Sequence, residues 1–279
     1  YLIYNSYNLQ NILITGGSSY LGSKIIDYFK DFKFYGLENR SKLLEKTNLT
    51  KFHDTDFKTI ISKNHIDIIM HFATNSDRTD QVDKNEVYKT NVLLGEKLLN
   101  ACIGSNVKLF ISTGTYSQDI FEISPNYYVE TKKTFENSLI AFNKKHKLTI
   151  QNYLLGDVYG KNDFRYNKLI NFLLQNEDKE QIKFNSNGLG AFSPIYIDDI
   201  LSIIEEGINS LHNENLYTRK IIASKVITVK EFVNFYKSAR GKDFKEIYSD
   251  EKNPYSNFKE INSEDLIFKT SIEKGLKNL

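Results

Sequence analysis

The stretch NILITGGSSYLG, Asn11 to Gly22, joins an apolar run, a glycine turn and the start of a helical pattern. This order predicts a strand, a phosphate-binding loop and a helix N-terminus, because Gly16 and Gly17 allow a tight turn and let backbone N–H groups approach an anion closely. Gly16, Ser19 and Gly22 occupy the three glycine places of a G-x-x-G-x-x-G loop, with serine in the middle. The spacing favours a dinucleotide ligand, and a plain strand-to-helix turn is the competing interpretation.

A second feature is a Y-x-x-x-K pair formed by Tyr128 and Lys132. On a helix this spacing places both side chains on one face. An ammonium beside a phenol favours the phenolate and lowers a pKa that starts near ~10, so the tyrosine can exchange a proton near neutral pH. The chain has 18 Tyr, so an exposed amphipathic helix is the alternative. The order favours catalysis, because the strand VKLFIST (Val107 to Thr113) ends in hydroxyls and the pair follows it.

Composition indicates an ordinary globular protein of 279 residues with 40% hydrophobic content and a net charge of +2. The dispersed basic residues give no stripe for nucleic acid, and no run approaches the ~18 apolar residues of a membrane span. The N-terminal stretch lacks the pattern of a signal peptide. The single Cys102 lies in a helical pattern with Leu98, Leu99 and Ile103, which predicts a buried thiol in a reducing, cytoplasmic protein. We expect no metal site.

Five further motifs follow one another in an order typical of one enzyme family: DIIMHFAT (Asp67 to Thr74), TNVLLGEKLLNAC (Thr90 to Cys102), LGDVYGKND (Leu155 to Asp163), SPIYIDDI (Ser193 to Ile200) and TSIEKGL (Thr270 to Leu276). With the glycine loop and the Tyr–Lys pair, they make the chain resemble the extended short-chain dehydrogenases/reductases that act on nucleotide sugars. The resemblance covers nearly everything from Asn11 to the C-terminus. The stretch from Leu155 to Leu174 is most similar to reductases that make CDP-linked 3,6-dideoxyhexoses.

Strand-like apolar runs alternate with amphipathic patterns over the first part of the chain: Ile12–Thr15, Lys33–Leu37, Ile66–Phe72, Lys108–Ser112 and Thr149–Leu155. This alternation predicts an α/β fold with a Rossmann-type, doubly wound parallel sheet and a ligand at the carboxyl ends of the strands. After Gly160 the alternation fades. We therefore expect a dinucleotide-binding domain at residues 1–160 and a smaller, mainly substrate-binding region at 161–279, with some return to the sheet.

The resemblance implies a nicotinamide cofactor. Glu38, at the end of the second strand, stands where relatives that prefer NAD carry an acid for the adenosine ribose, whereas Arg40 suits the 2′-phosphate of NADP. We favour NAD and leave NADP open. Asp54 matches a residue that meets the adenine, with a solvated loop acid as the alternative. The expected cofactor contacts are Gly16, Ser18, Ser19, Tyr20, Leu21, Gly22, Glu38, Asn39, Arg40, Asp54, Thr55, Phe72, Ala73, Thr74, Asn91, Lys132 and Val158.

The third catalytic group should be a hydroxyl at the end of VKLFIST. Continuing the strand without a gap selects Thr113, whereas counting back from Tyr116 selects Ser112. We prefer Thr113, because loops absorb length changes more readily than strands. Related dehydratases carry an Asp–Glu pair after this threonine, and here Gly114 and Thr115 follow. Without an acid and a base in those places, the sequence argues against a 4,6-dehydratase.

The resemblance also implies substrate contacts at Asn75, Thr113, Thr115, Tyr128, Asp157 and Lys168. Asp157 replaces an asparagine that often meets the sugar or the diphosphate, and a carboxylate there needs neutralisation. Phe192 stands where many relatives have an arginine that clamps the diphosphate. Arg165 or Lys168 is a candidate for the missing cation, with a solvated charge at a helix end as the alternative.

Taken together, these residues imply an NAD(P)-dependent oxidoreductase that acts at C4 of a nucleotide-linked hexose or heptose, in the synthesis of polysaccharide precursors. Tyr128 would exchange the proton, Lys132 would hold the cofactor ribose, and Thr113 would orient the sugar oxygen. A 4-ketoreductase, a 4-dehydrogenase and a C4-epimerase share this chemistry. A protein that binds the dinucleotide as a sensor, without catalysis, is the alternative from another class.

Two helices bear on assembly, because relatives commonly dimerise through helices that here would begin at about Thr90 and Tyr128. The first carries Leu93, Leu94 and Leu98, and the second carries Phe135, Leu139 and Phe142 at helical spacing. These stripes predict a homodimer, with core packing as the alternative. Asn91, near the start of the first helix, matches an asparagine that holds a structural or proton-relay water, and helix capping is its competing interpretation.

Overall fold

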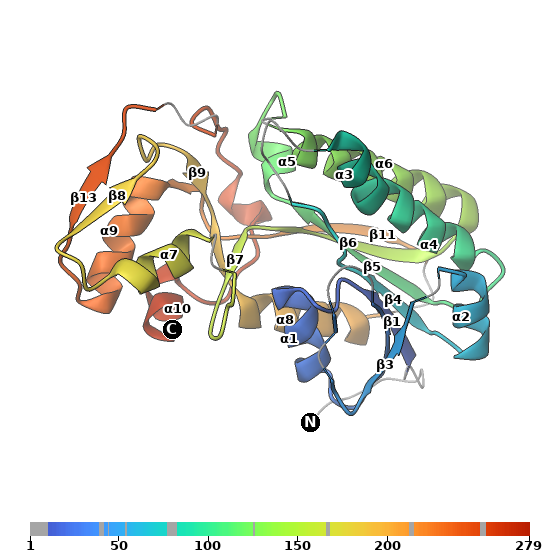
Figure 1. Ribbon diagram of the computed structural model, residues 1–279. Helices are drawn as coiled ribbons and strands as arrows, with labels where there is room; N and C mark the ends of the chain where they lie inside the picture. Colours follow the sequence, from blue (N-terminus) through green and yellow to red (C-terminus); the bar gives the residue numbers. More distant parts are fainter. Residues whose placement is uncertain are drawn as a thin grey trace. The chain divides into compact units, whose positions relative to one another are not determined.

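The computed structural model (Figure 1) describes residues 11–38, 42–43, 45–53, 55–76, 83–124, 126–165, 168–211, 215–251 and 255–279. The chain divides into two compact units. Unit 1 takes residues 1–115, 126–153 and 201–220, and unit 2 takes residues 116–125, 154–200 and 221–279. Because the chain passes between the units several times, their division differs from a single boundary at residue 160.

The sheet contains seven described strands: β1 (Asn11–Thr15), β2 (Lys33–Leu37), β3 (Leu49–Phe52), β4 (Ile68–His71), β5 (Leu109–Thr115), β6 (Thr149–Leu155) and β11 (Tyr217–Ile222). Their order is β11-β6-β5-β4-β1-β2-β3. The pairs of β1 with β2 and β4, of β2 with β3 and of β4 with β5 are parallel. The strand order therefore reverses between β1 and β4, as in a doubly wound Rossmann-type sheet, and the predicted fold class is confirmed.

Helices cover both faces of this sheet (Figure 1). The helices of this part of the chain are α1 (Tyr20–Tyr28), α2 (Phe57–Lys63), α3 (Lys84–Tyr88), α4 (Leu94–Cys102), α6 (Tyr127–His146) and α8 (Ile197–Asn209). Helix α1 and the unit 1 part of α8 lie on one face, where the Tyr28 hydroxyl donates to Glu205 Oε2 at 2.7 Å. Helices α2, α4 and α6 lie on the other face.

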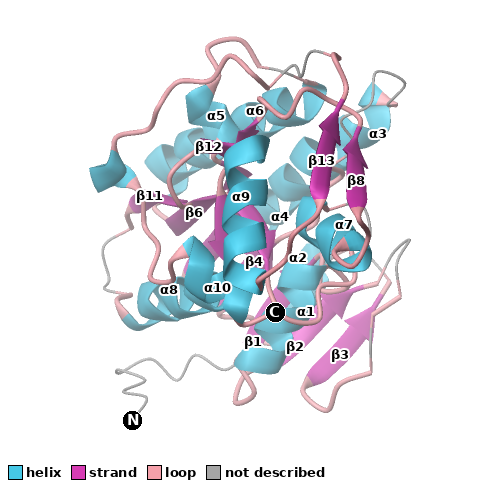
Figure 2. Ribbon diagram, turned by 90° about the vertical axis from the view of Figure 1, so that its left-hand side faces the viewer, coloured by secondary structure: helices cyan, strands magenta, loops and turns pink. Residues whose placement is uncertain are grey.

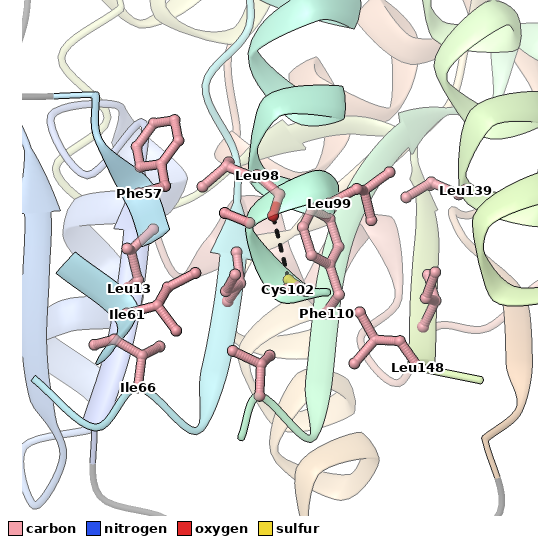
Figure 3. Close-up of a cluster of buried hydrophobic side chains, with 14 of the residues drawn as sticks. Leu13, Phe57, Ile61, Ile66, Leu98, Leu99, Cys102, Phe110, Leu139 and Leu148 are labelled. Carbon is pink, nitrogen blue, oxygen red and sulfur yellow. Dashed lines mark hydrogen bonds between the residues drawn. The ribbon is translucent and has the colours of Figure 1, made fainter. Parts of the chain in front are cut away.

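The core beneath α2, α4 and α6 is apolar and continuous (Figure 3). It includes Leu13 of β1, Phe110 of β5 and Leu139 of α6. Cys102 lies in the same cluster with 7% of its surface exposed, and its thiol donates to the Leu98 carbonyl. Burial raises the pKa of this thiol to about 12. The predicted buried and unreactive cysteine is thereby confirmed.

The same core accounts for most of the apolar surface on which the dimer prediction was based. Phe135 and Leu139 are buried in it, and Leu94 and Phe142 pack against its edge. Leu93 is the large apolar residue of these stripes that stays exposed, at 44%. Core packing within one chain thus explains the stripes, and the dimer remains a prediction.

The helix expected from about Thr90 begins earlier. Helical backbone runs from Lys84 through a π-helical segment, Lys89–Leu93, into α4. Asp83 caps its start by accepting from the N–H groups of Asn85 and Glu86. Asn91 therefore lies inside the helix, in the π-helical turn, and the capping interpretation of Asn91 is wrong. Such turns are rare in proteins, and those that occur often lie at functional sites.

Unit 2 is built from short strand pairs and helices. Its strands are β7 (Asp157–Tyr159), β8 (Gln181–Phe184), β9 (Ala191–Phe192), β10 (Pro194–Tyr196), β12 (Ile227–Thr228) and β13 (Lys245–Tyr248). Its helical segments are α5 (Ser117–Ile120), α7 (Leu169–Asn176), α9 (Val229–Arg240), the 3₁₀ turn Ser263–Asp265 and α10 (Ile272–Lys277). Figure 2 shows the parallel pair β8–β13 beside α9, and Phe232 and Tyr236 of α9 share a core with Phe184 of β8.

A search of the described residues for membrane-crossing helices found none with the necessary length and hydropathy.

The contact between α4 and α6 gives a stability prediction. A Cβ on Gly95 would lie 2.2 Å from Phe135 Cζ and 3.0 Å from His71 Nε2. Because overpacking a filled core costs roughly 1–3 kcal/mol, Gly95→Ala should lower the free energy of unfolding by that amount, measured by urea denaturation. Asn100→Ala, at an exposed position of the same helix, is the control and should change it by less than ~0.5 kcal/mol. Equal stabilities of the two variants would contradict the packing described.

Candidate active site

The glycine loop joins β1 to α1 and requires glycine at two places. Gly16 has φ of +77°, and a Cβ there would lie 2.5 Å from the Ala73 nitrogen. A Cβ on Gly22 would lie 2.2 Å from the Gly16 carbonyl oxygen. Ser19 caps α1, because its hydroxyl accepts from the Gly22 N–H at 3.0 Å. The helix thus begins at the carboxyl end of β1, and its N-terminal partial positive charge suits a phosphate group.

The loop after β4 lies against this turn, so the structure brings together two groups of predicted cofactor residues. Ser18 and Ser19 precede α1, Tyr20 and Leu21 begin it, and Phe72 and Ala73 follow β4. Phe72 is buried, and its carbonyl carbon would lie 2.6 Å from a Cβ on Gly16. This tight backbone packing requires glycine at residue 16, because a Cβ there would collide with the backbone that follows β4. The chain therefore fits a dinucleotide here.

Glu38 stands at the carboxyl end of β2, next to the glycine loop. Its Oε2 accepts from the Leu43 N–H at 2.7 Å and lies 3.6 Å from Lys51 Nζ. The hydrogen bond from Leu43 is the main cause of a lowered pKa of Glu38, and the charge of Lys51 acts in the same direction. The carboxylate is therefore ionised at neutral pH.

Other predicted adenosine contacts surround Glu38 in the sequence. Thr55 is exposed, and its Oγ1 lies 3.4 Å from Lys97 Nζ. Asn39, Arg40 and Asp54 lie outside the described residues.

Tyr128 and Lys132 lie one turn apart near the start of α6. Asn126 caps the helix by accepting from the Val129 N–H at 3.0 Å. Both side chains are buried, and Lys132 Nζ donates to the backbone carbonyl of Thr113 at 2.9 Å. Burial lowers the pKa of Lys132 to about 8. The structure thus brings the predicted lysine to the end of β5, beside the predicted hydroxyl residue.

Thr113 and Ser112 differ in their surroundings. In β5, successive side chains point to opposite faces of the sheet, and Ser112 is paired in register with His71 of β4. Within the described part of the chain, the buried Ser112 hydroxyl has no hydrogen-bond partner. Thr113 is 7% exposed, and its carbonyl is fixed by Lys132. The choice between the two hydroxyls remains a prediction in favour of Thr113. Thr115, the last residue of β5, is buried.

His71 lies in the same buried layer. Its Nδ1 is 2.7 Å from Thr15 Oγ1, and its ring packs edge-on against Phe135. Burial, followed by the charge of Lys132, lowers the pKa of His71 to about 3. The imidazole is therefore neutral, which avoids a second positive charge beside the ammonium.

Asn91 ties the loop after β4 to α6. Its Oδ1 accepts from the Asn75 N–H at 2.7 Å and from the Thr74 hydroxyl at 3.1 Å. Its Nδ2 donates to the Asn75 carbonyl and to Thr131 Oγ1, both at 3.0 Å. Thr131 lies between Tyr128 and Lys132 on α6. With both donors and both acceptor positions occupied, Asn91 fixes the geometry of the loop relative to the start of α6, where Tyr128 and Lys132 lie.

In unit 2, Asp157 is already engaged by the protein. Its Oδ2 accepts from the Tyr116 hydroxyl at 2.8 Å and from the Ser193 N–H at 3.0 Å. These contacts join the start of β7 to the residue before β10 and to the turn after β5. Asp157 therefore has hydrogen-bond partners in its own unit, and its contact with the sugar or the diphosphate remains a prediction.

The two candidate cations of unit 2, Arg165 and Lys168, have different surroundings. Arg165 forms an ion pair with the buried Asp163 and donates to the Val158 carbonyl at 2.6 Å. Its charge is compensated there, which favours Lys168 over Arg165 as the cation for a diphosphate, and the choice between them remains a prediction. Lys168 precedes α7 at the N-cap position and stays the candidate. Phe192 packs against Phe232, with ring centroids 4.6 Å apart.

The sequence did not predict three residues that contact the candidate site residues Glu38 and Asn91. The Leu43 N–H and the Lys51 ammonium contact Glu38, and Thr131 contacts Asn91. The place of Thr131 could have been predicted from the sequence, because it lies between two predicted catalytic residues on one helix. Leu43 contacts Glu38 through its backbone N–H, and a backbone contact cannot be predicted from the residue type.

Comparison with known proteins gives the family. Residues 12–213 match the model of the NAD dependent epimerase/dehydratase family. The chain belongs to this family. Membership confirms the resemblance seen in the motifs, the assignment to NAD-dependent enzymes, and NAD as the cofactor.

The curated relatives act on different nucleotide sugars. The chain is 27% identical over 241 residues to CDP-abequose synthase from Salmonella muenchen. The aligned region covers 82% of this chain and 80% of the relative. It is 24% identical over 239 residues, 72% of its length, to a trifunctional UDP-glucose 4,6-dehydratase/UDP-4-keto-6-deoxy-D-glucose 3,5-epimerase/UDP-4-keto-L-rhamnose-reductase from Arabidopsis thaliana. The chain spans only 35% of the length of that relative.

Solved structures support the fold. UDP-glucose 4-epimerase from Thermotoga maritima matches with a TM-score of 0.82 at 20% identity, over 96% of both chains. UDP-glucuronic acid 4-epimerase from Bacillus cereus matches with a TM-score of 0.80 at 16% identity, over 96% of this chain and 97% of the other.

The buried ammonium of Lys132 gives a prediction about stability. A fall of its pKa from 10.5 to about 8 corresponds to a cost on the order of 3 kcal/mol at neutral pH. Lys132→Met removes this cost but also loses the hydrogen bond to the Thr113 carbonyl, which destabilises the variant by about 1–2 kcal/mol. Lys132→Met should therefore raise the free energy of unfolding of the apoprotein by about 1–2 kcal/mol at pH 7.

The pH dependence has a defined sign. Between pH 8 and 10.5 the unfolded chain binds more protons at Lys132 than the folded chain, so the stability of the wild type rises with pH there. The advantage of Lys132→Met should shrink across that window in urea denaturation. The neighbouring Lys133→Met is the control and should change stability by less than ~0.5 kcal/mol. A Lys132→Met protein less stable than wild type at pH 7 would refute this account.

Proposed function

We propose that this chain is an NAD-dependent oxidoreductase that transfers hydride at C4 of a nucleotide-linked sugar, as a 4-ketoreductase or 4-dehydrogenase. The observation that carries the proposal is the buried Lys132 ammonium, held at the end of β5 and one helical turn from Tyr128. NAD supplies the hydride acceptor or donor when it is bound. Such enzymes make precursors of cell-surface polysaccharides.

Each residue of the site has a stated part in this proposal. Tyr128 exchanges a proton with the C4 hydroxyl or ketone as general base or acid. Lys132 favours the phenolate and holds the cofactor ribose, since only one of the three donors of an ammonium is used on the Thr113 carbonyl. The Thr113 hydroxyl orients the reacting sugar oxygen.

Binding of the sugar nucleotide is assigned to Asn75 and Thr115. Lys168 is the preferred cation for the diphosphate, because the charge of Arg165 is compensated by Asp163. Asp157 serves to position the strand ends that it joins.

Elimination of water is disfavoured, although several curated relatives are named as dehydratases. Gly114 and Thr115 follow Thr113, and neither residue can act as the acid or the base that elimination from a hexose needs. The relative from Salmonella muenchen, which the chain covers to 80%, is named as a synthase of a CDP-linked sugar. These two points support oxidation or reduction at C4.

C4-epimerisation is the second candidate, because the same Tyr–Lys pair serves it. A reductase or dehydrogenase changes the net amount of reduced cofactor, whereas an epimerase returns the hydride to the same sugar. Purified protein should therefore be incubated with CDP-, GDP-, UDP- and dTDP-linked sugars and their 4-keto forms. Absorbance of the reduced nicotinamide reports net transfer, and proton NMR of the sugar reports inversion at C4. Binding of NAD with neither change would indicate a sensor and refute the proposal.

Tyr128 provides the direct test of the catalytic assignment. Tyr128→Phe should lower turnover by at least ~100-fold, because it removes the group that exchanges the proton. Its dissociation constant for NAD, measured by calorimetry, should stay within about twofold of wild type. Tyr127→Phe, which changes the neighbouring tyrosine that packs near Lys84, is the matched control and should keep turnover. Turnover of Tyr128→Phe close to that of wild type would remove Tyr128 from the mechanism.

A further inference from the structure

The carboxyl ends of β2 and β3 form a small charged cluster around Glu38. The Glu38 N–H donates to the Phe52 carbonyl at 2.8 Å, which holds the two strand ends together. From β3, Lys51 directs its ammonium to this place. Lys51 Nζ donates to the Leu43 carbonyl at 2.8 Å, contacts Glu45 Oε1 at 2.5 Å and lies 3.6 Å from Glu38 Oε2.

Leu43 makes this cluster part of the cofactor loop. Its N–H and carbonyl bind Glu38 and Lys51 respectively, while its buried side chain packs where a Cβ on Gly17 or on Gly36 would lie, at 2.9 and 2.8 Å. In the described residues, the contacts of the Glu38 side chain all engage Oε2. Among these residues Oε1 is left to accept from a ribose hydroxyl, and Lys51 Nζ lies 3.6 Å from the other oxygen of the same carboxylate.

The partners that now occupy Lys51 are exchangeable. The Glu45 side chain is 91% exposed, and exposed ion pairs contribute little to stability. The side chains of Lys51 and Glu38 are 23% and 15% exposed, so both reach solvent at the site. A phosphate group is a stronger acceptor for an ammonium than an exposed carboxylate. Lys51 can therefore leave Glu45 when a phosphate is present.

We propose that Lys51 is a latent binding residue for a ribose 2′-phosphate, the group that distinguishes NADP from NAD, and that Glu38 and Glu45 keep it occupied. The proposal rests on the assignment of Glu38 to the adenosine ribose of the bound cofactor. Glu38 then disfavours NADP in two ways, because it repels the phosphate and also holds the cation that the phosphate needs. Removing the charge of Glu38 releases Lys51 for the phosphate.

The experiment is a double-mutant cycle read by calorimetric titration with NAD and NADP, without any assay of turnover. The wild type should bind NAD more tightly than NADP. Glu38→Gln should bind NADP at least ~10-fold more tightly than the wild type does, since a repulsion is removed and a cation is released. In Glu38→Gln/Lys51→Met most of that gain should be lost, while NAD affinity stays within about twofold of the Glu38→Gln variant.

Three controls accompany the cycle. Lys33→Met, in the Glu38→Gln background, removes an exposed lysine at the opposite end of β2 and should keep the gain. Lys51→Gln retains a donor for the Leu43 carbonyl and should lose the gain as Lys51→Met does, which separates the lost charge from a disturbed loop. Arg40→Ala in the Glu38→Gln background tests the other basic residue of this stretch. Thermal melting establishes that each variant is folded.

The outcomes separate this proposal from the proposed function. If Glu38→Gln gains NADP affinity and Lys51→Met leaves the gain intact, or if Arg40→Ala alone abolishes it, Lys51 is not the phosphate ligand, although NAD binding and catalysis stand. If Glu38→Gln leaves both affinities unchanged, the assignment of Glu38 to the ribose is wrong and the proposal falls with it. If the wild type binds neither cofactor, the proposed function fails as well.

Discussion

The site depends on one buried charge, the Lys132 ammonium, and on the carbonyl that holds it. An ammonium out of water is unfavourable unless it is hydrogen-bonded, and here the Thr113 carbonyl provides that bond at 2.9 Å. The bond keeps its geometry only if the end of β5 and the start of α6 stay in place. The apolar core beneath α4 and α6 and the four hydrogen bonds of Asn91 provide that support.

Backbone groups hold the charged side chains in both units. The Leu43 N–H binds Glu38, the Thr113 carbonyl binds Lys132, and the Ser193 N–H binds Asp157. Backbone partners do not titrate, so the positions of these side chains do not depend on the protonation of a second side chain. They also leave other atoms of the same side chains available to ligands.

Neutral surroundings on the sheet side of Lys132 complete this arrangement. His71 is uncharged and hydrogen-bonded to Thr15, and its ring packs edge-on against Phe135. A charged histidine there would repel the ammonium. Among the described residues, no ion pair with a carboxylate offsets the cost of burying Lys132. This is typical of functional sites, where stability is given up for reactivity.

The sequence by itself determined the features that follow from local periodicity and from single-residue sterics. It located β2 at Lys33–Leu37 and β6 at Thr149–Leu155, and the glycine spacing identified a loop in which a Cβ would collide with the backbone. The Tyr–Lys spacing placed two side chains on one helix face, because an α-helix repeats every ~3.6 residues.

Only the tertiary structure decided which groups meet across long stretches of chain. The bond between Asn91 and Thr131, the bond of Lys132 to the Thr113 carbonyl and the Lys51–Glu38 contact have no local signature in the sequence. The apolar stripes of α4 and α6 could serve a core or a dimer equally well, and packing against the sheet assigned most of them to the core. Local propensity acts over a few residues, whereas these contacts depend on how strands and helices far apart in the sequence are brought together.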